Sequence, residues 1–504
     1  MLLLDSQTLS GGRISGGWLQ PPSQLLRYRN IAYLTGDLKP GGLFVQPSPH
    51  FWGPNYEWDR ESLEQLQQRG ASTVILDQLP ASLPHGLPVY LTPDTTVALA
   101  ELAIAARNAS PAPRVCVTGS VGKSTTKRGI AALLAQLGCV HESQRNFNHY
   151  QGVLLSLAAL PQKADFAVLE FSSDAPRNTL PKAMIAAPHL AVITDIQYDH
   201  TDCYPTLEAI ADQKSLLFRG LQPGSPAVLN RDSPYFERMA TAAISYGAAE
   251  IISFGTSPLA DVRLASWSTD QGGSQVEVEL RGRPLRYRLK LPGRHNVINS
   301  LAMLAAVGGL GLDPEPCLPA LATLESLQRH CLEQELPLNG GSLHLIDDSF
   351  SANPASLRAA LDTLDLRAGP AGGRRLLVLG EIDELGRRSD ALHAGLADPI
   401  LRYGIDRVFA HGRQTRHTCA ALPPERVAVQ TDDAEALQQA LLEELRPGDW
   451  LLLKFSRHSS LGRGLRQALR QLNAVAPATP PDGTPLPSGP GFERPVRPGP
   501  GAQS

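Results

Sequence analysis

The chain has 504 residues, a length that indicates about three domains rather than one compact core. Its 46 Lys and Arg residues nearly balance 49 Asp and Glu residues, and the net charge of −3 excludes a polybasic nucleic-acid or membrane role. With 42% hydrophobic and 19% charged residues, 44 Gly and 42 Pro, the composition is typical of a loop-rich globular protein and excludes coiled coils and fibrous repeats.

The first part of the chain alternates short apolar runs with Pro- and Gly-rich turns. The runs predict strands at residues 42–45, 72–76 and 88–91. Ala and Leu recur at helical spacing over residues 96–108, which predicts a helix. We therefore expect a small α/β domain over residues 1–112.

Strands then alternate with helices in two series. The first series has strands from residue 114, at 166–169 and at 190–193, and it predicts a parallel sheet covered on both faces over residues 113–326. The second series predicts a Rossmann-like domain over residues 327–474. Its expected strands lie at residues 343–346, 375–379, 407–410 and 450–453.

The end of the chain differs in composition. Residues 475–504 contain nine Pro and five Gly, which predicts a disordered tail, with a polyproline II linker or ligand segment as the alternative. We see no export signal and no apolar run long enough to span a membrane. The cysteines are scattered without a CxxC pair, so we expect reduced thiols in a cytoplasmic protein. They are Cys116, Cys139, Cys203, Cys317, Cys331 and Cys419.

The strongest local signal is Val-Cys-Val-Thr-Gly-Ser-Val-Gly-Lys-Ser-Thr-Thr at residues 115–126. A strand, a tight glycine loop and a helix expose backbone N–H groups to phosphate, while Lys123 adds a positive charge and the Ser124 hydroxyl can bind Mg²⁺. Val117 occupies the first glycine position of the full template. The alternative is a glycine-containing β-turn before an ordinary helix.

Residues 118–127 resemble the shortened phosphate loop of the Mur ligase family, ATP-dependent enzymes that build the peptide of bacterial cell-wall precursors. Further segments match that family in the same order, over about residues 36–460. They are Asn-Phe-Asn-x-x-x-Gly at 146–152, Val-Leu-Glu at 168–170, Asp-His at 199–200, Ala-Asp-Gln-Lys at 211–214 and Gly-Arg-His-Asn-Val-x-Asn at 293–299. Asp-Asp-Ser-Phe-Ser-Ala-Asn-Pro at 347–354 and Gly-Glu-x-x-Glu-Leu-Gly at 380–386 resemble the branch that adds D-alanyl-D-alanine to a UDP-linked tripeptide.

The resemblance implies the three-domain Mur ligase architecture. Residues 1–112 would recognise the acid substrate, 113–326 would form the central ATP-binding P-loop domain, and 327–474 would close over it as a lid. It also implies ADP- and phosphate-forming amide (peptide) bond synthesis, in which a carboxylate is activated as an acyl phosphate and then attacked by an amine.

The resemblance further implies ATP, two Mg²⁺ ions and a carbamylated Lys214. The implied catalytic residues are Lys123, Lys214, His200 and Asn146. The implied metal ligands are Ser124, Glu170, His200 and Lys214. The implied nucleotide-binding residues are Gly119, Ser120, Gly122, Lys123, Ser124, Thr125, Asn296, Asn299, Arg329, Asp348, Asn353 and Lys454.

Plain structural interpretations stay open for five of these positions. Glu170 is alternatively an exposed carboxylate at a strand end, and His200 a loop histidine with satisfied hydrogen bonds. Lys214 is alternatively a solvated helix lysine paired with Asp212 or another charge. Asn296 would then cap a helix, and Lys454 would be a strand-end lysine with its amine in solvent.

Several positions that face the substrate in that branch carry other residues here. Its Asp-Ser-Arg loop is replaced by Leu-Thr-Gly-Asp at 34–37, its Asp-Gly-His motif by Gly-Pro-Asn-Tyr at 53–56, and its Gly-Asn-x-Asn-Asn by Arg-Asn-Phe-Asn-His at 145–149. Tyr-Asn becomes Phe-Ser at 350–351, and Lys-Gly-Ser-Arg becomes Lys-Phe-Ser-Arg at 454–457.

Three hypotheses therefore compete. One is the cell-wall ligase of peptidoglycan biosynthesis. Another is a paralogous ligase that joins a different acid and amine, as in a specialised metabolite or a poly-amino acid; the folate-polyglutamylating relatives are a further, less similar enzyme. The last is a nucleotide-binding protein that no longer ligates. The ligase hypotheses predict small-molecule acid and amine partners, no nucleic acid and no membrane span, and the family implies a monomer.

Overall fold

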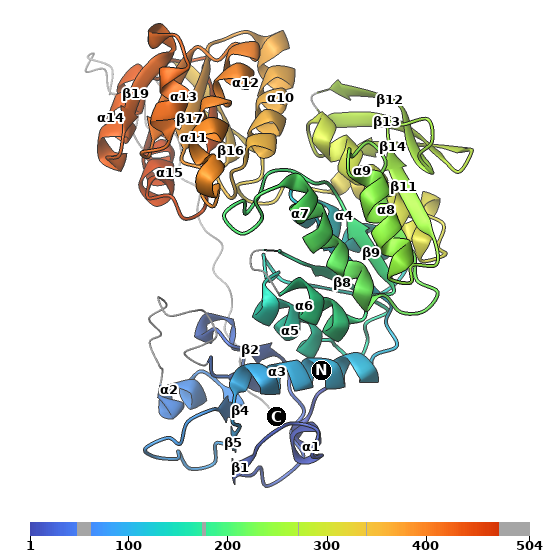
Figure 1. Cartoon of the computed structure of the whole chain (residues 1–504). Coiled ribbons are helices and arrows are strands. Elements are labelled where there is room, and N and C mark those ends of the chain that lie inside the picture. The colour runs from blue at the N-terminus through green and yellow to red at the C-terminus, as the bar shows by residue number, and fades with distance from the viewer. Residues whose placement is uncertain (48–61, 174–177, 271, 339, 473–504) are drawn as a thin grey trace, which may run out of the picture.

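The computed structural model describes residues 1–47, 62–173, 178–270, 272–338 and 340–472. The predicted tail at 475–504 and the segment 53–56 lie outside these residues. The chain forms three sheets that follow one another in sequence order, drawn in blue, in green to yellow, and in orange to red (Figure 1). The predicted α/β fold class is confirmed. No helix of the described part is both long and apolar enough to cross a bilayer.

The N-terminal sheet has the strand order β1-β5-β4-β3-β2. Only β1 runs antiparallel to its neighbour. The three predicted strands are confirmed as β3, β4 and β5, and the predicted helix is α3, which begins where Asp94 accepts a hydrogen bond from the backbone of Thr96. The elements are α1 (Ser6–Ser10), β1 (Gly17–Gln20), β2 (Ile31–Ala32), β3 (Gly42–Val45), α2 (Leu63–Gln68), β4 (Ala71–Leu76), β5 (Val89–Leu91) and α3 (Thr95–Ala109).

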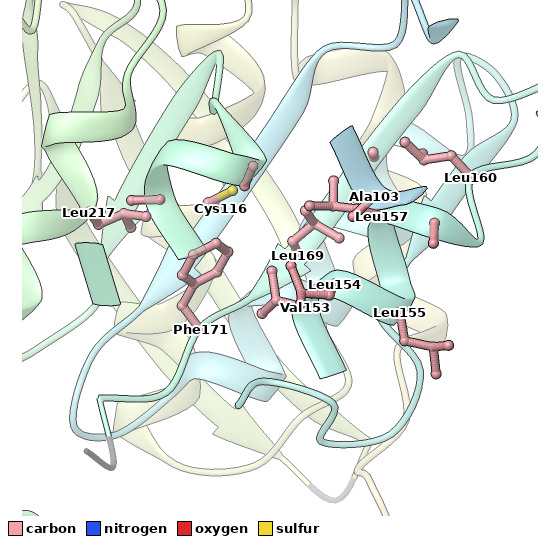
Figure 2. Packing of buried hydrophobic residues seen from close by; sticks show 14 of the residues in the cluster. Ala103, Cys116, Val153, Leu154, Leu155, Leu157, Leu160, Leu169, Phe171 and Leu217 are labelled. Atoms are coloured by element: carbon pink, nitrogen blue, oxygen red, sulfur yellow. The ribbon is translucent and has the colours of Figure 1, made fainter. Parts of the chain in front are cut away.

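One hydrophobic core joins this N-terminal part to the central sheet. Apolar side chains of α3 such as Ala103 pack against α5 (Tyr150–Ala158), which contributes Leu154 and Leu157 (Figure 2). Leu169 of the central sheet belongs to the same cluster. The packing therefore continues across residue 112, and it fixes the N-terminal sheet beside the central one.

The central sheet has the order β14-β13-β12-β11-β10-β9-β6-β8-β7. Successive residues of a strand point to opposite faces, and Val115 and Cys116 of β6 accordingly enter two different clusters. The expected coverage of both faces is confirmed. Its strands are β6 (Arg114–Thr118), β7 (Val140–Glu142), β8 (Phe166–Glu170), β9 (Leu190–Ile193), β10 (Ala227–Asn230), β11 (Ile251–Gly255), β12 (Val262–Asp270), β13 (Gly273–Leu280) and β14 (Arg283–Leu289). Its further helices are α4 (Lys123–Leu134), α6 (Thr179–Ala186), α7 (Leu207–Ser215), α8 (Phe236–Ser245) and α9 (Arg294–Gly309).

The sequence did not predict the antiparallel end of this sheet. β12, β13 and β14 form a meander in which antiparallel pairs follow each other. Many residues of β12 are partly or fully exposed, so the strand lacks the continuous apolar run by which the buried parallel strands were found.

The C-terminal sheet has the order β15-β16-β20-β17-β18-β19, with only β15 antiparallel. The four predicted strands are confirmed as β16, β17, β18 and β20. The strands are β15 (Leu332–Leu338), β16 (Gly341–Asp348), β17 (Arg375–Gly380), β18 (Arg407–His411), β19 (Val427–Thr431) and β20 (Trp450–Lys454). The helices are α10 (Pro354–Ala371), α11 (Ser389–Ala394), α12 (Ala397–Arg402), α13 (Thr415–Ala420), α14 (Ala434–Glu444) and α15 (Leu461–Gln471).

Candidate active site

The predicted phosphate loop connects β6 to α4 through two glycines with positive φ. Gly119 has φ +151° and Gly122 has φ +79°. A Cβ on Gly119 would lie 1.9 Å from Thr194 Oγ1, and one on Gly122 would lie 2.4 Å from Asn299 Oδ1, so both positions need glycine. No side chain caps α4, and the first N–H groups of the helix are therefore available to an anion.

The segment after β9 holds this loop in place. Thr194 Oγ1 donates to the carbonyl of Val121 over 2.5 Å. The backbone N–H of Ser120 donates to the carbonyl of Asp195, and the Ser120 hydroxyl donates to that of Gln197. Burial raises the pKa of Asp195. The carboxyl ends of β6 and β9 thus meet at one edge of the sheet, where ligands of parallel α/β sheets usually bind.

Glu170 ends β8 at the same edge and is 1% exposed, which rules out an exposed strand-end carboxylate. Its Oε1 accepts a hydrogen bond of 2.7 Å from Asn148 Nδ2. Its Oε2 is buried and has no hydrogen-bond partner among the described residues. A buried carboxylate oxygen is costly without a partner, and beside a phosphate loop this oxygen fits a divalent cation.

Protein carboxylates and imidazoles alone do not complete a metal site. No group of three or more His, Cys, Asp or Glu within the described ranges is arranged to hold an ion. A cation at Glu170 would therefore draw its remaining ligands from Ser124, water or phosphate oxygens. Mg²⁺ is commonly bound in this way, by one or two carboxylates together with substrate phosphates.

His200 lies in the loop after β9 with its Nδ1 paired to the carboxylate of Glu384, from the C-terminal part of the chain. Its Nε2 is 3.7 Å from Asp199 Oδ2. Burial lowers the pKa of His200, but the carboxylates of Glu384 and Asp199 outweigh it, and the net shift is upward. Lys214 of α7 is close enough for its charge to oppose that rise.

Lys214 is 1% exposed, so the solvated-lysine interpretation is wrong. Asp212, one of the charges considered as its partner, has its carboxylate bound by Arg238 Nε over 2.6 Å. Burial of a charged amine is costly unless protein groups compensate the charge or the amine gives it up. The Lys214 amine therefore lies among protein groups rather than in solvent.

Asn296 and Asn299 occupy the first turns of α9, beside the phosphate loop. Asn296 is not the N-cap, which is Gly293. Its Nδ2 donates to the carbonyl of Pro292 over 2.6 Å, so the amide supports the start of the helix. Asn299 lies against Gly122. His295, which precedes Asn296, is half-buried, and desolvation lowers its pKa.

The C-terminal part contributes a buried ion pair to the opposite wall. Asp348 ends β16 and Lys454 ends β20, where the two are register partners and form an ion pair. Lys454 is 1% exposed and also donates to the carbonyl of Ser351 over 2.9 Å, which excludes the strand-end lysine with a solvated amine. Asn353 caps α10 through Oδ1, which accepts from the backbone of Ser356.

A cleft of about 590 Å³ between the central and C-terminal sheets brings most predicted residues together. That volume suits a small-molecule ligand. The predicted residues that line it are Ser120, Gly122, Lys123, Ser124, Thr125, Asn146, Glu170, His200, Asn296, Asn299, Asp348, Asn353 and Lys454. Gly119, Lys214 and Arg329 do not line it; the Arg329 guanidinium lies 5.2 Å from the centre of the Phe350 ring.

Sequence reasoning missed several residues at the edges of this cleft. Lys182 is buried and donates to the carbonyl of Ser172 over 2.7 Å and to that of Asn148 over 3.2 Å, which positions the Asn148 loop. Asp37 of the N-terminal part pairs with Arg145 of that loop over 2.7 Å. The only sequence signal for these contacts was the departure from the family pattern at residues 34–37 and 145.

A phosphate loop on a parallel sheet, an open buried carboxylate and a facing Rossmann-like domain define a three-domain nucleotide-binding enzyme. Residues 117–307 match the model of the Mur ligase middle domain, and residues 336–457 match that of the Mur ligase glutamate ligase domain. The chain belongs to the Mur ligase family, and it is an ATP-dependent ligase that forms an amide bond.

Named relatives support this assignment along most of the chain. The UDP-N-acetylmuramoyl-tripeptide--D-alanyl-D-alanine ligase of Synechocystis sp. is 31% identical over 89% of this chain and 94% of its own length. The ligase of the same name from Bacillus subtilis is 30% identical over 79% of this chain and 85% of its own length.

Solved structures share the fold. MurF from Acinetobacter baumannii has a TM-score of 0.78 at 22% identity, over 92% of this chain and 98% of that chain. MurF from Thermotoga maritima, in complex with ADP, has a TM-score of 0.72 at 22% identity, over 89% and 99%. The predicted resemblance to the family is confirmed.

Proposed function

We propose that this chain adds D-alanyl-D-alanine to UDP-N-acetylmuramoyl-tripeptide in peptidoglycan biosynthesis. The observation that carries the proposal is the 31% identity to a ligase of that name over 94% of its length, which includes the N-terminal part as well as the ATP machinery. Retention of Lys123, Glu170, His200 and Lys214 argues against a nucleotide-binding protein that has lost ligation.

In this proposal the phosphates of ATP bind at the start of α4. Gly119, Ser120, Gly122 and Thr125 provide backbone donors or shape the loop that presents them, and Lys123 provides a positive charge. The first reaction step brings a carboxylate to the γ-phosphate, so two anions must approach each other. Fixed donors at this position offset that repulsion without reorganising during the reaction.

Two Mg²⁺ ions would, when bound, shield the charge of the phosphates and of the substrate carboxylate. We assign Ser124 and Glu170 to one ion, and His200 and Lys214 to the other. The open Glu170 Oε2 supports the first assignment. An ammonium would repel a cation, and we therefore infer that the Lys214 amine adds CO₂ and loses a proton, giving a carbamate anion that can ligate the metal.

The other proposed residues bind substrate from both walls. Asn146 would orient the acid on the central side, and Asn296 and Asn299 would contact adenine. Arg329, Asp348, Asn353 and Lys454 would meet the nucleotide from the C-terminal side as that part closes further, which keeps water from the acyl phosphate. Because one chain supplies both walls of the cleft, we propose that the protein acts as a monomer.

A different acid substrate is the second candidate. Asp37 and Arg145 pair where the N-terminal part meets the Asn146 loop, and both lie in segments that depart from the D-alanyl-D-alanine-adding branch. In this second proposal, the ion pair would change the charges that an acid substrate meets where the N-terminal part borders the cleft.

Phosphate release with a panel of acids and amines tests both candidates. The proposal expects release only when UDP-N-acetylmuramoyl-tripeptide, D-alanyl-D-alanine and ATP are all present, with a product whose mass shows loss of one water from the two substrates. Release with another acid and no release with the tripeptide would establish the second candidate instead.

A further inference from the structure

Two loops from distant parts of the sequence form a contact beside the cleft. The Thr201 hydroxyl donates to the carbonyl of Leu385 over 2.8 Å, and the backbone N–H of Asp202 donates to that of Glu384 over 3.3 Å. Arg388 Nε donates to the carbonyl of Pro205 over 3.0 Å. We call this contact between residues 198–205 and 384–388 the loop clasp; it joins the central part of the chain to the C-terminal part.

His200 and Glu384 lie at the centre of the loop clasp. Both have left-handed backbone conformations, with φ +52° and +61°, which residues other than glycine rarely adopt. Such conformations persist where the surrounding structure requires them, and they concentrate at functional sites. Here they bring His200 Nδ1 onto the Glu384 carboxylate.

The ion pair adds too little folding free energy to explain why two residues adopt these strained conformations. The Glu384 side chain is 54% exposed, and ion pairs at that exposure contribute little to folding because water and salt screen them. The contact bears instead on the state of the imidazole ring: Nδ1 lies at ion-pair distance from the Glu384 carboxylate, and it has no hydrogen bond of ordinary geometry to any other described residue. When Nδ1–H donates to a carboxylate, Nε2 keeps its lone pair, and it is the ring nitrogen left for a ligand in the cleft.

We propose that Glu384 is the positioning residue of His200; this inference rests on the metal-binding role proposed above for His200. Glu384 holds His200 as the Nδ1–H tautomer, and Nε2, which lies 3.7 Å from Asp199 Oδ2, is then the ring nitrogen that binds a divalent cation. Since Glu384 belongs to the C-terminal part, the metal site of the central part is complete only when the loop clasp is formed. Docking of the C-terminal part and metal binding are thereby coupled.

The first test reads the tautomer in the intact, metal-free protein. Histidine labelled with ¹³C and ¹⁵N reports which ring nitrogen carries the proton, and the His200 signal is the one that disappears in His200→Gln. We expect the Nδ1–H form in the wild type, a shift toward Nε2–H in Glu384→Ala, and retention of Nδ1–H in Glu384→Gln, whose amide oxygen still accepts. Identical His200 signals in the wild type and Glu384→Ala overturn the proposal.

The second test measures metal binding with Mn²⁺ as the probe. Mn²⁺ is titrated into protein saturated with ADP, and the free ion is followed by EPR. We expect Glu384→Ala to bind its weaker Mn²⁺ about tenfold less tightly than the wild type, since loss of the partner of a metal-bound histidine has effects of that size or more. Unchanged Mn²⁺ affinity in Glu384→Ala overturns the proposal.

Asp390→Asn is the matched control. Asp390 lies on α11 in the same region, is 66% exposed and faces His417 at 3.4 Å. The Asp390→Asn substitution removes one negative charge and changes no contact of the loop clasp. The tautomer signal and the Mn²⁺ affinity should therefore match those of the wild type. Neither readout requires turnover: absence of amide formation with every substrate pair would refute the proposed function, whereas normal ligation with unchanged tautomer and Mn²⁺ binding in Glu384→Ala refutes this inference alone.

Discussion

Replacing Gly122 with alanine tests how the phosphate site is built. Gly122 has φ +79°, and a Cβ there would lie 2.4 Å from Asn299 Oδ1, closer than the 3.0 Å that real Cβ atoms keep. The left-handed backbone costs an L-residue about 1–2 kcal/mol. The Asn299 amide must also move, or the loop must shift and turn its N–H groups away from the phosphates.

Gly224→Ala separates the two effects. Gly224 has φ +81° and nothing within 4 Å of the added Cβ, so it carries the backbone cost without a collision. We expect both variants to lose about 1–2 kcal/mol of unfolding free energy in urea titrations. Calorimetric titration with ADP should show weaker binding only for Gly122→Ala. One misdirected hydrogen bond to a charged phosphate is worth about 1.5–3 kcal/mol, or roughly a tenfold to hundredfold change in Kd.

The reasoning is refuted if Gly122→Ala binds ADP as tightly as Gly224→Ala does. A double-mutant cycle with Asn299→Ala then locates the cause. If the collision moves the loop, Gly122→Ala should cost less affinity in the Asn299→Ala background than in the wild type. Equal costs in both backgrounds would mean that the left-handed backbone alone disturbs the loop.

Three further predictions concern buried groups. Lys454→Met should cost about 3–5 kcal/mol of stability in urea titrations because it leaves the Asp348 carboxylate buried and unpaired, and the double variant with Asp348→Asn should recover part of that loss. Lys214→Ala should abolish phosphate release, and an added short carboxylic acid should restore part of it; full activity without the acid would contradict the carbamate. His393 is fully buried, its Nε2 accepts from the backbone of Ile382, and burial lowers its pKa. The unfolded state therefore binds the proton more readily, so unfolding free energy should fall as pH drops below about 6.5, and less steeply in His393→Gln.

Local sequence patterns predicted the elements that are buried and continuous. β3, β17 and β20 are nearly continuous apolar runs between turn residues, and β16 contains a shorter run at residues 343–346 that His344 interrupts. Such runs are recognisable because most residues of a buried parallel strand are apolar. The half-exposed β12 lacks that signature and was missed. The phosphate loop was also predictable, since its turn depends on glycines a few residues apart.

The positions of the site residues could be predicted from local sequence, but their contacts could not. Glu170 was predicted from its place at a strand end, and Ser124 from its place after Lys123 in the loop. Their surroundings were not predictable: the interpretation of Lys214 as a solvated helix lysine paired with Asp212 or another charge was wrong because Lys214 is 1% exposed. Asp212 receives Arg238 of another helix. Which charge lies opposite another depends on how helices dock, and no local spacing encodes it.

The sequence by itself thus determined the α/β class, the order of the strand–helix series, the phosphate loop and the family. Tertiary structure alone decided that Asn299 closes on Gly122, that Asp348 pairs with Lys454 and that Glu384 reaches His200. The physical reason is range. Strand and loop propensities arise between residues a few positions apart, whereas these contacts join segments more than a hundred residues apart and form only when whole sheets and loops pack against each other.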